Sequence, residues 1–318
     1  MNRREFLQYS GAAATLSAIR HASALSKTSR GKISFTFDDP KTESDCSLTW
    51  REVNDRMLST LAKQNVKAIL FVCGKRVDRA PGGDLISQWD RAGHLIGNHS
   101  YSHLNFNESP DGSNADGVTL AQFELDVLKN EPLIRGYRNF RRMFRYPFFK
   151  EGDTAERRDG MRSFLQMHGY RIGRATIDAS DWAIDARMAN KAHAADADLT
   201  GYRDFYLEHI WQRAQYYDSL ASRLMPAPVR HTVLLHHNAL NALFLGDLMA
   251  MFRNKGWTII DAEYAYQDAI YDRQPKTLPA GESLIWALAK ESGRFEKELR
   301  YPGEDDVYEN PRMDALRL

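Results

Sequence analysis

Short runs of β-branched and aromatic residues alternate with longer helical stretches over most of this chain. The strand candidates are residues 32–37, 67–72, 95–98, 143–145, 171–177, 232–235 and 258–260. The helix candidates are residues 50–64, 84–92, 119–134, 155–168, 200–222, 239–254 and 261–269. Strand–helix units in this order predict a parallel sheet, which is most economically closed or nearly closed into a barrel. We therefore expect an α/β fold, a single deformed (β/α)7-type barrel.

Length and composition suit one large domain with a few additions. The chain has 318 residues, of which 43% are hydrophobic and 27% are charged, so it can build a core and shows no sign of disorder. The net charge is +1 and the Lys and Arg residues are scattered, which argues against a nucleic-acid partner. Three segments are additions to a minimal barrel. They are a polar loop at 105–118, a helical insertion at 183–226, and an extension at 274–318 that is expected to pack on the barrel.

The N-terminus has the pattern of an export signal. Arg3 and Arg4 precede a Phe-Leu pair, a run of small and apolar residues follows at 11–19, and Ala-Ser-Ala at 22–24 suits a cleavage site. This segment resembles the twin-arginine signal of bacteria, so residues 1–24 are expected to engage the twin-arginine export machinery and to be removed. We expect the mature protein in the periplasm or outside the cell. No other stretch approaches twenty uninterrupted apolar residues.

The chain contains only two cysteines, Cys46 and Cys73. An oxidising compartment permits a disulfide, but one bridge in a chain of this length is not a disulfide framework. Cys73 ends an apolar run, whereas Cys46 lies in a polar loop, so we expect two separate thiols.

Carboxylates and imidazoles follow the ends of predicted strands. Asp38 and Asp39 close the first strand, and His99 and His103 follow the third. One carboxylate and two imidazoles make the three-ligand set of an open divalent-metal site. The other carboxylate is then placed to act as a base on a metal-bound water. This pattern predicts metal-assisted hydrolysis.

Five motifs in chain order resemble those of the polysaccharide deacetylases, which carry a NodB homology domain and form carbohydrate esterase family 4. Together they span roughly residues 33 to 270, and each falls at the end of a predicted strand. They are Thr-Phe-Asp-Asp at 36–39, His-Ser-x-x-His at 99–103, Arg-x-Pro with two aromatics at 145–149, Asp-x-x-Asp-Trp at 178–182 and Leu-x-His at 234–236. The resemblance assigns residues 25–273 to a NodB-like deacetylase domain.

By this resemblance, Asp39, His99 and His103 hold a divalent metal, which is most commonly zinc, with Co²⁺, Ni²⁺ and Mn²⁺ as alternatives. The i, i+4 spacing lets both imidazoles face one point from a single helical turn. Asp38 is the implied general base. Arg145 is expected to lie against it and keep it ionised at neutral pH.

The other motif residues are implied to handle the leaving group and the acyl group. His236 is the implied general acid, and Asp181 is expected to hydrogen-bond its other ring nitrogen. The backbone N–H of Phe148 is expected to stabilise the oxyanion. Trp182 and Leu234 are implied to form a small apolar pocket that fits a methyl group.

Two positions depart from the family pattern. Pro40 stands where glycine usually follows the two acidic residues, so the loop beside the metal must run differently. His237 follows His236, where it would serve as an alternative acid, bind substrate or be exposed. We expect His236 to be the acid because the Leu-x-His spacing selects it.

Three functions are compatible with these motifs. The first is a metal-dependent hydrolase that removes acetyl groups, chiefly N-acetyl, from an extracytoplasmic glycan. The second is a hydrolase of the same fold that opens a small cyclic amide. The third is a carbohydrate-binding relative without activity. Because the expected base, acid and three metal ligands are all present, the first function is favoured over the third.

Overall fold

The computed structural model of the chain describes residues 31–44, 46, 48–107, 117–191, 198–300 and 306–318. The expected signal segment at 1–24, including the arginine pair, lies outside the described residues. The same holds for most of the polar loop expected at 105–118.

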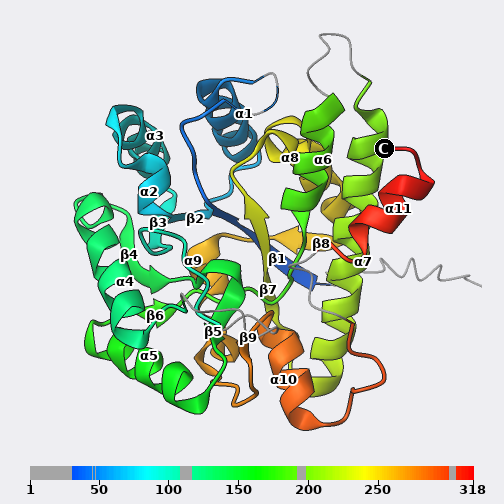
Figure 1. Cartoon of the computed structure of the whole chain (residues 1–318). Coiled ribbons are helices and arrows are strands. Elements are labelled where there is room, and N and C mark those ends of the chain that lie inside the picture. The colour runs from blue at the N-terminus through cyan, green and yellow to red at the C-terminus, as the bar shows by residue number, and fades with distance from the viewer. Residues whose placement is uncertain (1–30, 45, 47, 108–116, 192–197, 301–305) are drawn as a thin grey trace, which may run out of the picture.

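A curled parallel sheet forms the centre of the molecule (Figure 1). Most of its strands lie within one or two residues of the predicted ranges. In spatial order they are β6 (Arg171–Ile172), β4 (Phe140–Phe144), β3 (Leu95–Asn98), β2 (Ile69–Val72), β1 (Gly31–Asp38) and β7 (Arg230–His236), with β8 (Trp257–Ile259) paired to the start of β1. The residues of β2 and β3 are buried throughout, as expected for parallel strands that are covered on both faces. The expected deformed (β/α)7-type fold is confirmed.

The segment from β6 onward bridges the gap between β4 and β7. Arg171 and Ile172 pair with β4, whereas Ile177 forms a single bridge to Val233 of β7. The prediction of one continuous strand over residues 171–177 is therefore wrong. The segment leaves one partner strand and joins another, so its ladder is interrupted at the crossing.

Helices surround the sheet (Figure 1). The longer ones are α1 (Trp50–Lys63), α3 (Ala80–Arg91), α4 (Leu120–Ile134), α5 (Ala155–Met167), α7 (Thr200–Leu224) and α8 (Ala239–Asn254). The shorter ones are α2 (Gly74–Val77), α6 (Asp181–Lys191) and α9 (Ala262–Ala265). Capping boxes at Thr49–Glu52 and Thr119–Gln122 explain why α1 and α4 begin near the predicted residues. None of the helices in the described ranges is long and apolar enough to cross a membrane.

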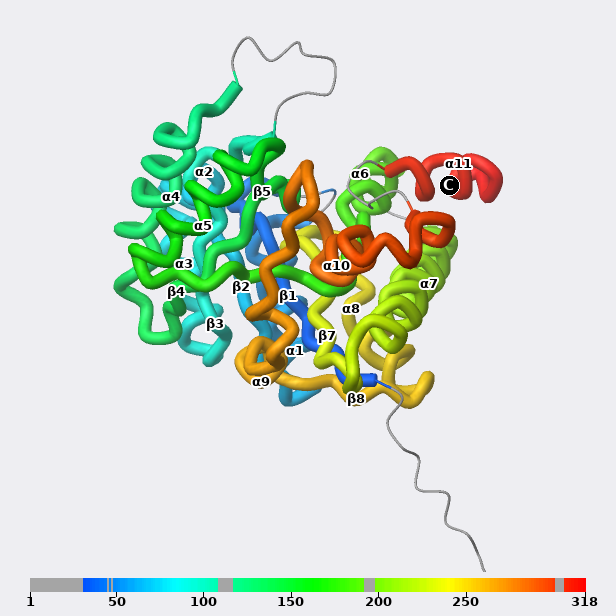
Figure 2. Tube along the Cα trace, turned by 90° about the horizontal axis from the view of Figure 1, so that it is seen from below, coloured from blue at the N-terminus to red at the C-terminus, as the bar shows by residue number. Residues whose placement is uncertain are grey.

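The C-terminal segment lies against the barrel (Figure 2). Its short strand β9 (Ala280–Gly281) pairs antiparallel with β5 (Lys150–Gly152), which follows β4 in the chain. Helix α10 (Leu284–Ser292) packs on α7, and α11 (Glu309–Ala315) lies against α6. The segment therefore contacts the region that carries the third motif. Elsewhere in the fold, Cys46 and Cys73 are not joined in a disulfide, as expected.

A buried ion cluster anchors β5. Glu151 accepts hydrogen bonds from Arg174 at 2.8 and 2.7 Å and from Arg162 at 3.0 Å, and Glu151 and Arg174 are each 4% exposed. Replacing Glu151 with alanine leaves the buried guanidinium of Arg174 without its carboxylate partner. The free energy of unfolding should fall by about 3–5 kcal/mol, measured by urea titration. Glu298→Ala removes the exposed Arg223–Glu298 pair and should lower the free energy of unfolding far less, because solvent screens that pair. Equal losses in the two variants would contradict the prediction.

Candidate active site

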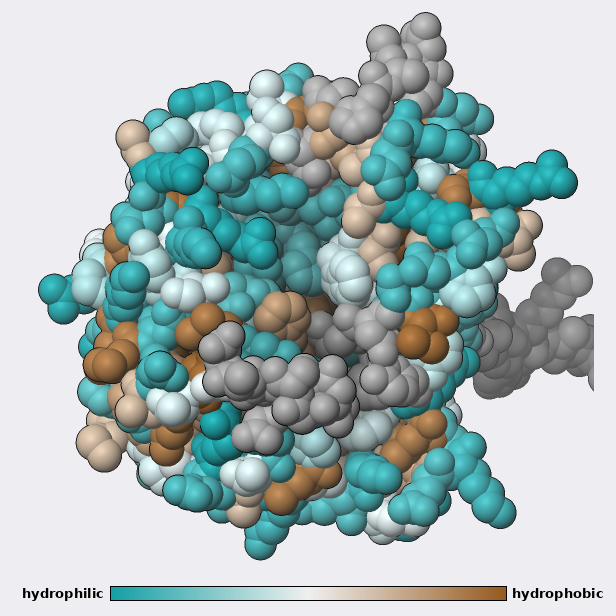
Figure 3. Space-filling model, viewed as in Figure 1, coloured by the Kyte–Doolittle hydropathy of each residue, from teal (hydrophilic) through white to brown (hydrophobic). Residues whose placement is uncertain are grey.

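The residues singled out by the motifs gather around one pocket of about 380 Å³ at the carboxyl ends of the strands. Parallel strands bring such residues together because their ends meet at one edge of the sheet. The register places Asp38 of β1 beside His236 of β7. Figure 3 shows a hollow near the centre of this face. The predicted residues that line the pocket are Asp38, Asp39, His99, His103, Phe148, Trp182, Leu234 and His236.

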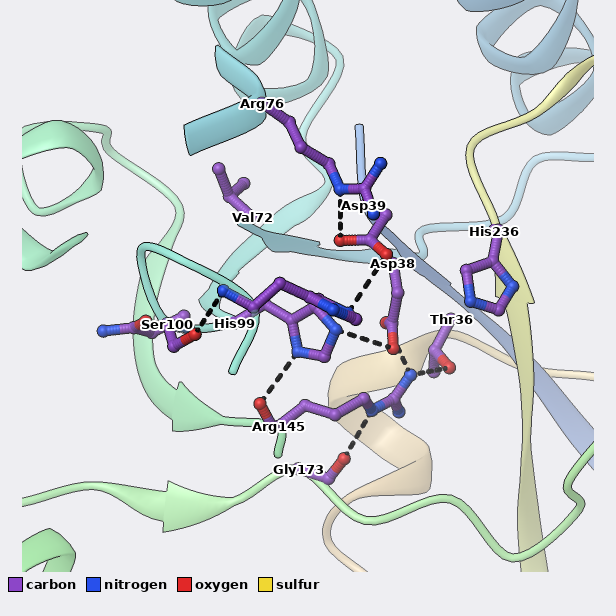
Figure 4. A network of polar contacts seen from close by, with 12 residues as sticks. Thr36, Asp38, Asp39, Val72, Arg76, His99, Ser100, Arg145, Gly173 and His236 are labelled. Carbon is purple, nitrogen blue, oxygen red and sulfur yellow. Dashed lines mark hydrogen bonds and ion pairs between the residues drawn. The ribbon is translucent and has the colours of Figure 1, made fainter. Parts of the chain in front are cut away.

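Asp39, His99 and His103 form a cluster with the donor set of a metal site. One ligand atom from each lies within 4.8 Å of the others. The Nε2 atom of His103 is 3.2 Å from one carboxylate oxygen of Asp39. The Nε atom of Arg76 is 3.1 Å from the other oxygen (Figure 4). Two imidazoles and a carboxylate that converge in this way can share one divalent cation.

The chemical state of these side chains also fits a cation. The Nδ1 atom of His99 donates to the carbonyl oxygen of Arg145 at 2.8 Å. This leaves Nε2, which is 3.6 Å from Asp38 Oδ2, as the nitrogen that can ligate a metal. Burial lowers the pKa of His99 to about 3, so its imidazole is neutral. Burial alone would raise the pKa of Asp39, but the contacts with His103 outweigh it and hold that pKa below the usual range. A neutral imidazole and an ionised carboxylate are the forms that bind metals.

The two histidines do not lie on a helical turn, so that prediction is wrong. Ser100 and His103 have left-handed backbone conformations, with φ of 59° and 57°. Side chains replace the helical hydrogen bonds: Asp126 of α4 accepts from the backbone N–H groups of Tyr101 and Ser102 at 3.1 and 2.9 Å. The spacing of four residues brings the imidazoles together through this tight loop instead.

Asp38 lies beside the cluster and is held by Arg145. The Nη1 atom of Arg145 donates to Asp38 Oδ1 at 2.8 Å and to the hydroxyl of Thr36 at 2.8 Å. Both Asp38 and Arg145 are buried, at 3% and 1% exposed. Burial raises the pKa of Asp38 to about 6, against the opposing charges of Arg145 and His236. Arg145 therefore limits the rise rather than holding the pKa at an ordinary carboxyl value.

Arg145 is fixed by partners that the motifs did not indicate. Its Nε donates to the carbonyl oxygen of Gly173 at 2.8 Å, and its Nη2 donates to the hydroxyl of Tyr266 at 3.0 Å. Its guanidinium also lies 4.1 Å from the ring centre of Phe71. No sequence signal marks Tyr266, because it follows a short helix far along the chain.

His236 is oriented by Asp181 on the opposite side of the pocket. The Nδ1 atom of His236 lies 2.7 Å from Asp181 Oδ1, and its backbone N–H donates to Asp181 Oδ2 at 2.9 Å. The side chains of Asn238 and Asn241 also donate to Asp181. Burial disfavours the charged imidazole, but Asp181 outweighs it and raises the pKa of His236 to about 10.

Replacing Asp181 with asparagine should remove most of this rise. Asp38 and Asp39 also face His236 and stay in place, so a smaller elevation of its pKa should persist. Relative to the ordinary value of 6.5, the raised pKa contributes stability that is complete below pH 6.5 and is lost as the pH rises to about 10. The metal-free variant should therefore lose less stability over this pH range than the wild type. Imidazole NMR titration and urea unfolding test this, and an unchanged pKa of His236 would refute it.

Several aromatic side chains line the pocket. The ring of Phe148 is 41% exposed and lies 4.5 Å from the ring of His103, edge to face. Trp182, at the start of α6, and Leu234, on β7, also line the pocket. Phe149 and Arg76 line it as well, although the motifs assign no role to either of them.

His237 is buried, at 1% exposed, so the alternative of an exposed imidazole is wrong. Its backbone N–H donates to the carbonyl oxygen of Asp38 at 2.9 Å, and its ring lies 6.2 Å from that of Trp89. Asp39, just before Pro40, has a left-handed backbone conformation with a φ of 57°. Aspartate is one of the residues that tolerate this conformation.

Residues 26–171 match the model of a family described as polysaccharide deacetylase. This segment of the chain is similar to the polysaccharide deacetylases. This confirms the family expected from the motifs, of which the first three lie inside the matched residues. The fourth and fifth motifs, at 178–182 and 234–236, follow the matched segment.

The individual relatives of this chain are distant. A peptidoglycan-N-acetylglucosamine deacetylase of Bacillus cereus is 23% identical over 156 residues, which cover 48% of this chain and 51% of the relative. The match thus spans about half the length of that relative. A carbohydrate esterase family 4 esterase of Streptococcus mutans is 18% identical, covers 74% of this chain and 87% of its own, and has a TM-score of 0.50. A pseudoenzyme of the same family from Bacillus anthracis is 17% identical, covers 74% and 64%, and has a TM-score of 0.48.

Proposed function

We propose that this chain is a metal-dependent hydrolase that removes acetyl groups, chiefly N-acetyl, from an extracytoplasmic glycan. The observation that carries the proposal is the meeting of three kinds of group in one pocket. The pocket is lined by the cluster of Asp39, His99 and His103, by the carboxylate of Asp38 and by the imidazole of His236. The polysaccharide deacetylase family supports the choice of an acetylated carbohydrate.

Asp39, His99 and His103 would hold the cation, for which zinc suits this donor set. The bound cation supplies Lewis acidity to the acyl oxygen and lowers the pKa of water. Asp38 takes the proton of the attacking water, with its carboxylate held in place by Arg145. His236 gives a proton to the leaving nitrogen or oxygen, with its ring fixed by Asp181.

The remaining pocket residues bind and orient the acyl group. The backbone N–H of Phe148 donates to the developing oxyanion. Leu234, at 4% exposed, and Trp182 provide an apolar surface for the methyl group. Their shared role is to hold the acyl carbon between Asp38 and His236.

Acetate release from a panel of substrates tests the proposal. The panel contains N-acetylglucosamine oligomers, purified peptidoglycan, an O-acetylated polysaccharide and a small cyclic amide. We expect release from at least one acetylated glycan, with N-acetyl preferred over O-acetyl. If only the cyclic amide is turned over, the substrate class is a small cyclic amide and not an acetylated glycan. Absence of turnover with the metal bound would instead indicate a carbohydrate-binding relative.

We also propose that residues 1–24 direct export, that residues 25–273 form the catalytic domain and that residues 274–318 extend it. The arginine pair before an apolar run supports the first part. Replacing Arg3 and Arg4 together with lysine should leave the protein in the cytoplasm, measured by cell fractionation. Unchanged delivery to the periplasm or medium would reject the twin-arginine route.

A further inference from the structure

The turn after β4 places two adjacent aromatic residues in left-handed backbone conformations. The φ angle is 54° at both Phe148 and Phe149. This region is strained for a residue with a Cβ and costs glycine nothing. The two rings differ in surroundings: Phe148 is 41% exposed at the pocket, whereas Phe149 is 5% exposed. The bulky, buried residue at position 149 is therefore held in a backbone conformation that is unfavourable for it.

The ring of Phe149 belongs to the apolar wall of the pocket. It packs with Leu234 and Ala175 in a small cluster of its own, separate from the main core. Phe149 and Leu234 both line the pocket. The ring centre lies 5.7 Å from the guanidinium carbon of Arg145, which holds Asp38. Phe149 thus occupies the space between the arginine that positions the base and the leucine assigned to the methyl group.

The C-terminal segment holds this residue in place. The backbone N–H of Glu282 donates to the carbonyl oxygen of Phe149 at 3.0 Å, and Lys150 pairs with Glu282 at 2.6 Å. A Cβ at Gly281, whose φ is 124°, would lie 1.7 Å from the same carbonyl oxygen. The strand β9 therefore presses against the backbone of Phe149, and only glycine at 281 allows this approach. The C-terminal segment, which lies outside the third motif, therefore helps to maintain the strained turn within that motif.

We propose that Phe149 limits the length of the acyl group by closing the apolar end of the pocket behind Leu234, and that β9 holds it there. This inference rests on the proposed acyl hydrolase function. An acetyl group fits in front of the ring, whereas the extra methylenes of a propionyl or butyryl group collide with it. The C-terminal segment then acts on substrate choice through the backbone of one residue.

This inference is tested by measuring kcat/KM on one glucosamine oligomer that carries acetyl, propionyl or butyryl groups. Each methylene in a fitted apolar pocket changes kcat/KM by about 10- to 200-fold. In Phe149→Gly, which removes both the ring and the strain, the preference for acetyl over butyryl should fall at least tenfold. Phe164→Ala is the matched control, because Phe164 is a buried phenylalanine of α5 outside the pocket. It should lower the melting temperature and leave the acyl preference unchanged. A folded Phe149→Gly protein with the wild-type preference would overturn the inference.

A second variant tests the contribution of β9. Gly281→Ala should relax the acyl preference in the same direction, because the new Cβ displaces the carbonyl group of Phe149. Gly293→Ala is its control, since that glycine also has a positive φ, 64°, but a Cβ added there would have no other atom within 4 Å. Equal acyl preferences in these two variants would show that β9 does not hold the ring.

Binding of the free acids separates this inference from the proposed function. Titrations of acetate and butyrate into the metal-loaded protein, followed by NMR, need no turnover. Phe149→Gly should bind butyrate at least tenfold more tightly relative to acetate than the wild type does. If the wild type hydrolyses no substrate but Phe149→Gly shows this shift in binding, the function fails and the pocket assignment stands. If acetyl is released and the shift is absent, the inference about Phe149 fails alone.

Discussion

Alanine at His103 should eliminate both metal binding and acetate release. His103 supplies one of three ligand atoms that lie within 4.8 Å of each other, so its loss leaves two protein ligands for the cation. Lewis-acid stabilisation of the transition state contributes several kcal/mol, which corresponds to about 10³-fold or more in rate. Metal content by mass spectrometry and kcat/KM should therefore fall together in His103→Ala and in His99→Ala.

A distant histidine provides the control for this prediction. His168 is the C-cap residue of α5 and does not line the pocket. His168→Ala should retain one equivalent of metal and wild-type kcat/KM. The assignment of the ligands would be contradicted if His103→Ala kept a full equivalent of metal, or if it lost the metal and kept its activity.

Asparagine at Asp38 should lower kcat by about 10²- to 10⁴-fold while leaving the metal bound. Asp38 is the carboxylate beside the cluster rather than a member of it, and the amide of asparagine cannot take the proton from water. The change also removes a 2.8 Å ion pair with buried Arg145, so the melting temperature should fall as well. Assays must therefore be run where circular dichroism shows the variant to be folded.

The neighbouring acid is the matched comparison for Asp38. Asp39→Asn should lose metal affinity, because Asp39 faces His103 at 3.2 Å, whereas Asp38→Asn should not. This contrast separates the base from the ligand in a pair of adjacent, chemically identical residues. If Asp38→Asn loses the metal, or if its kcat stays within tenfold of the wild type, the assignment of the base is wrong.

Much of the fold could be predicted because the evidence for it is local and periodic. Apolar runs of strand length and helical stretches alternate in the sequence, and the structure confirms the resulting parallel α/β arrangement. The convergence of Asp38, His99 and His236 follows from the same pattern, since each stands at the carboxyl end of a parallel strand.

Features that depend on contacts between distant segments could not be read from the sequence. The strands β5 and β9 have three and two residues and lie about 130 residues apart, so neither shows a hydrophobic pattern. The contact of Tyr266 with Arg145 is likewise a product of the closed barrel. The loop of His99 and His103 misled the prediction for another reason: a spacing of four residues suits both a helical turn and a tight loop.

Titration of metal into the stripped protein is the decisive test of metal-dependent deacetylation. Chelated protein is assayed for acetate release on the best acetylated glycan while zinc is added in steps. We expect release at background level before addition, full recovery at one equivalent, and no recovery in His103→Ala. Release that persists at less than a tenth of an equivalent of any divalent metal would contradict the proposed mechanism.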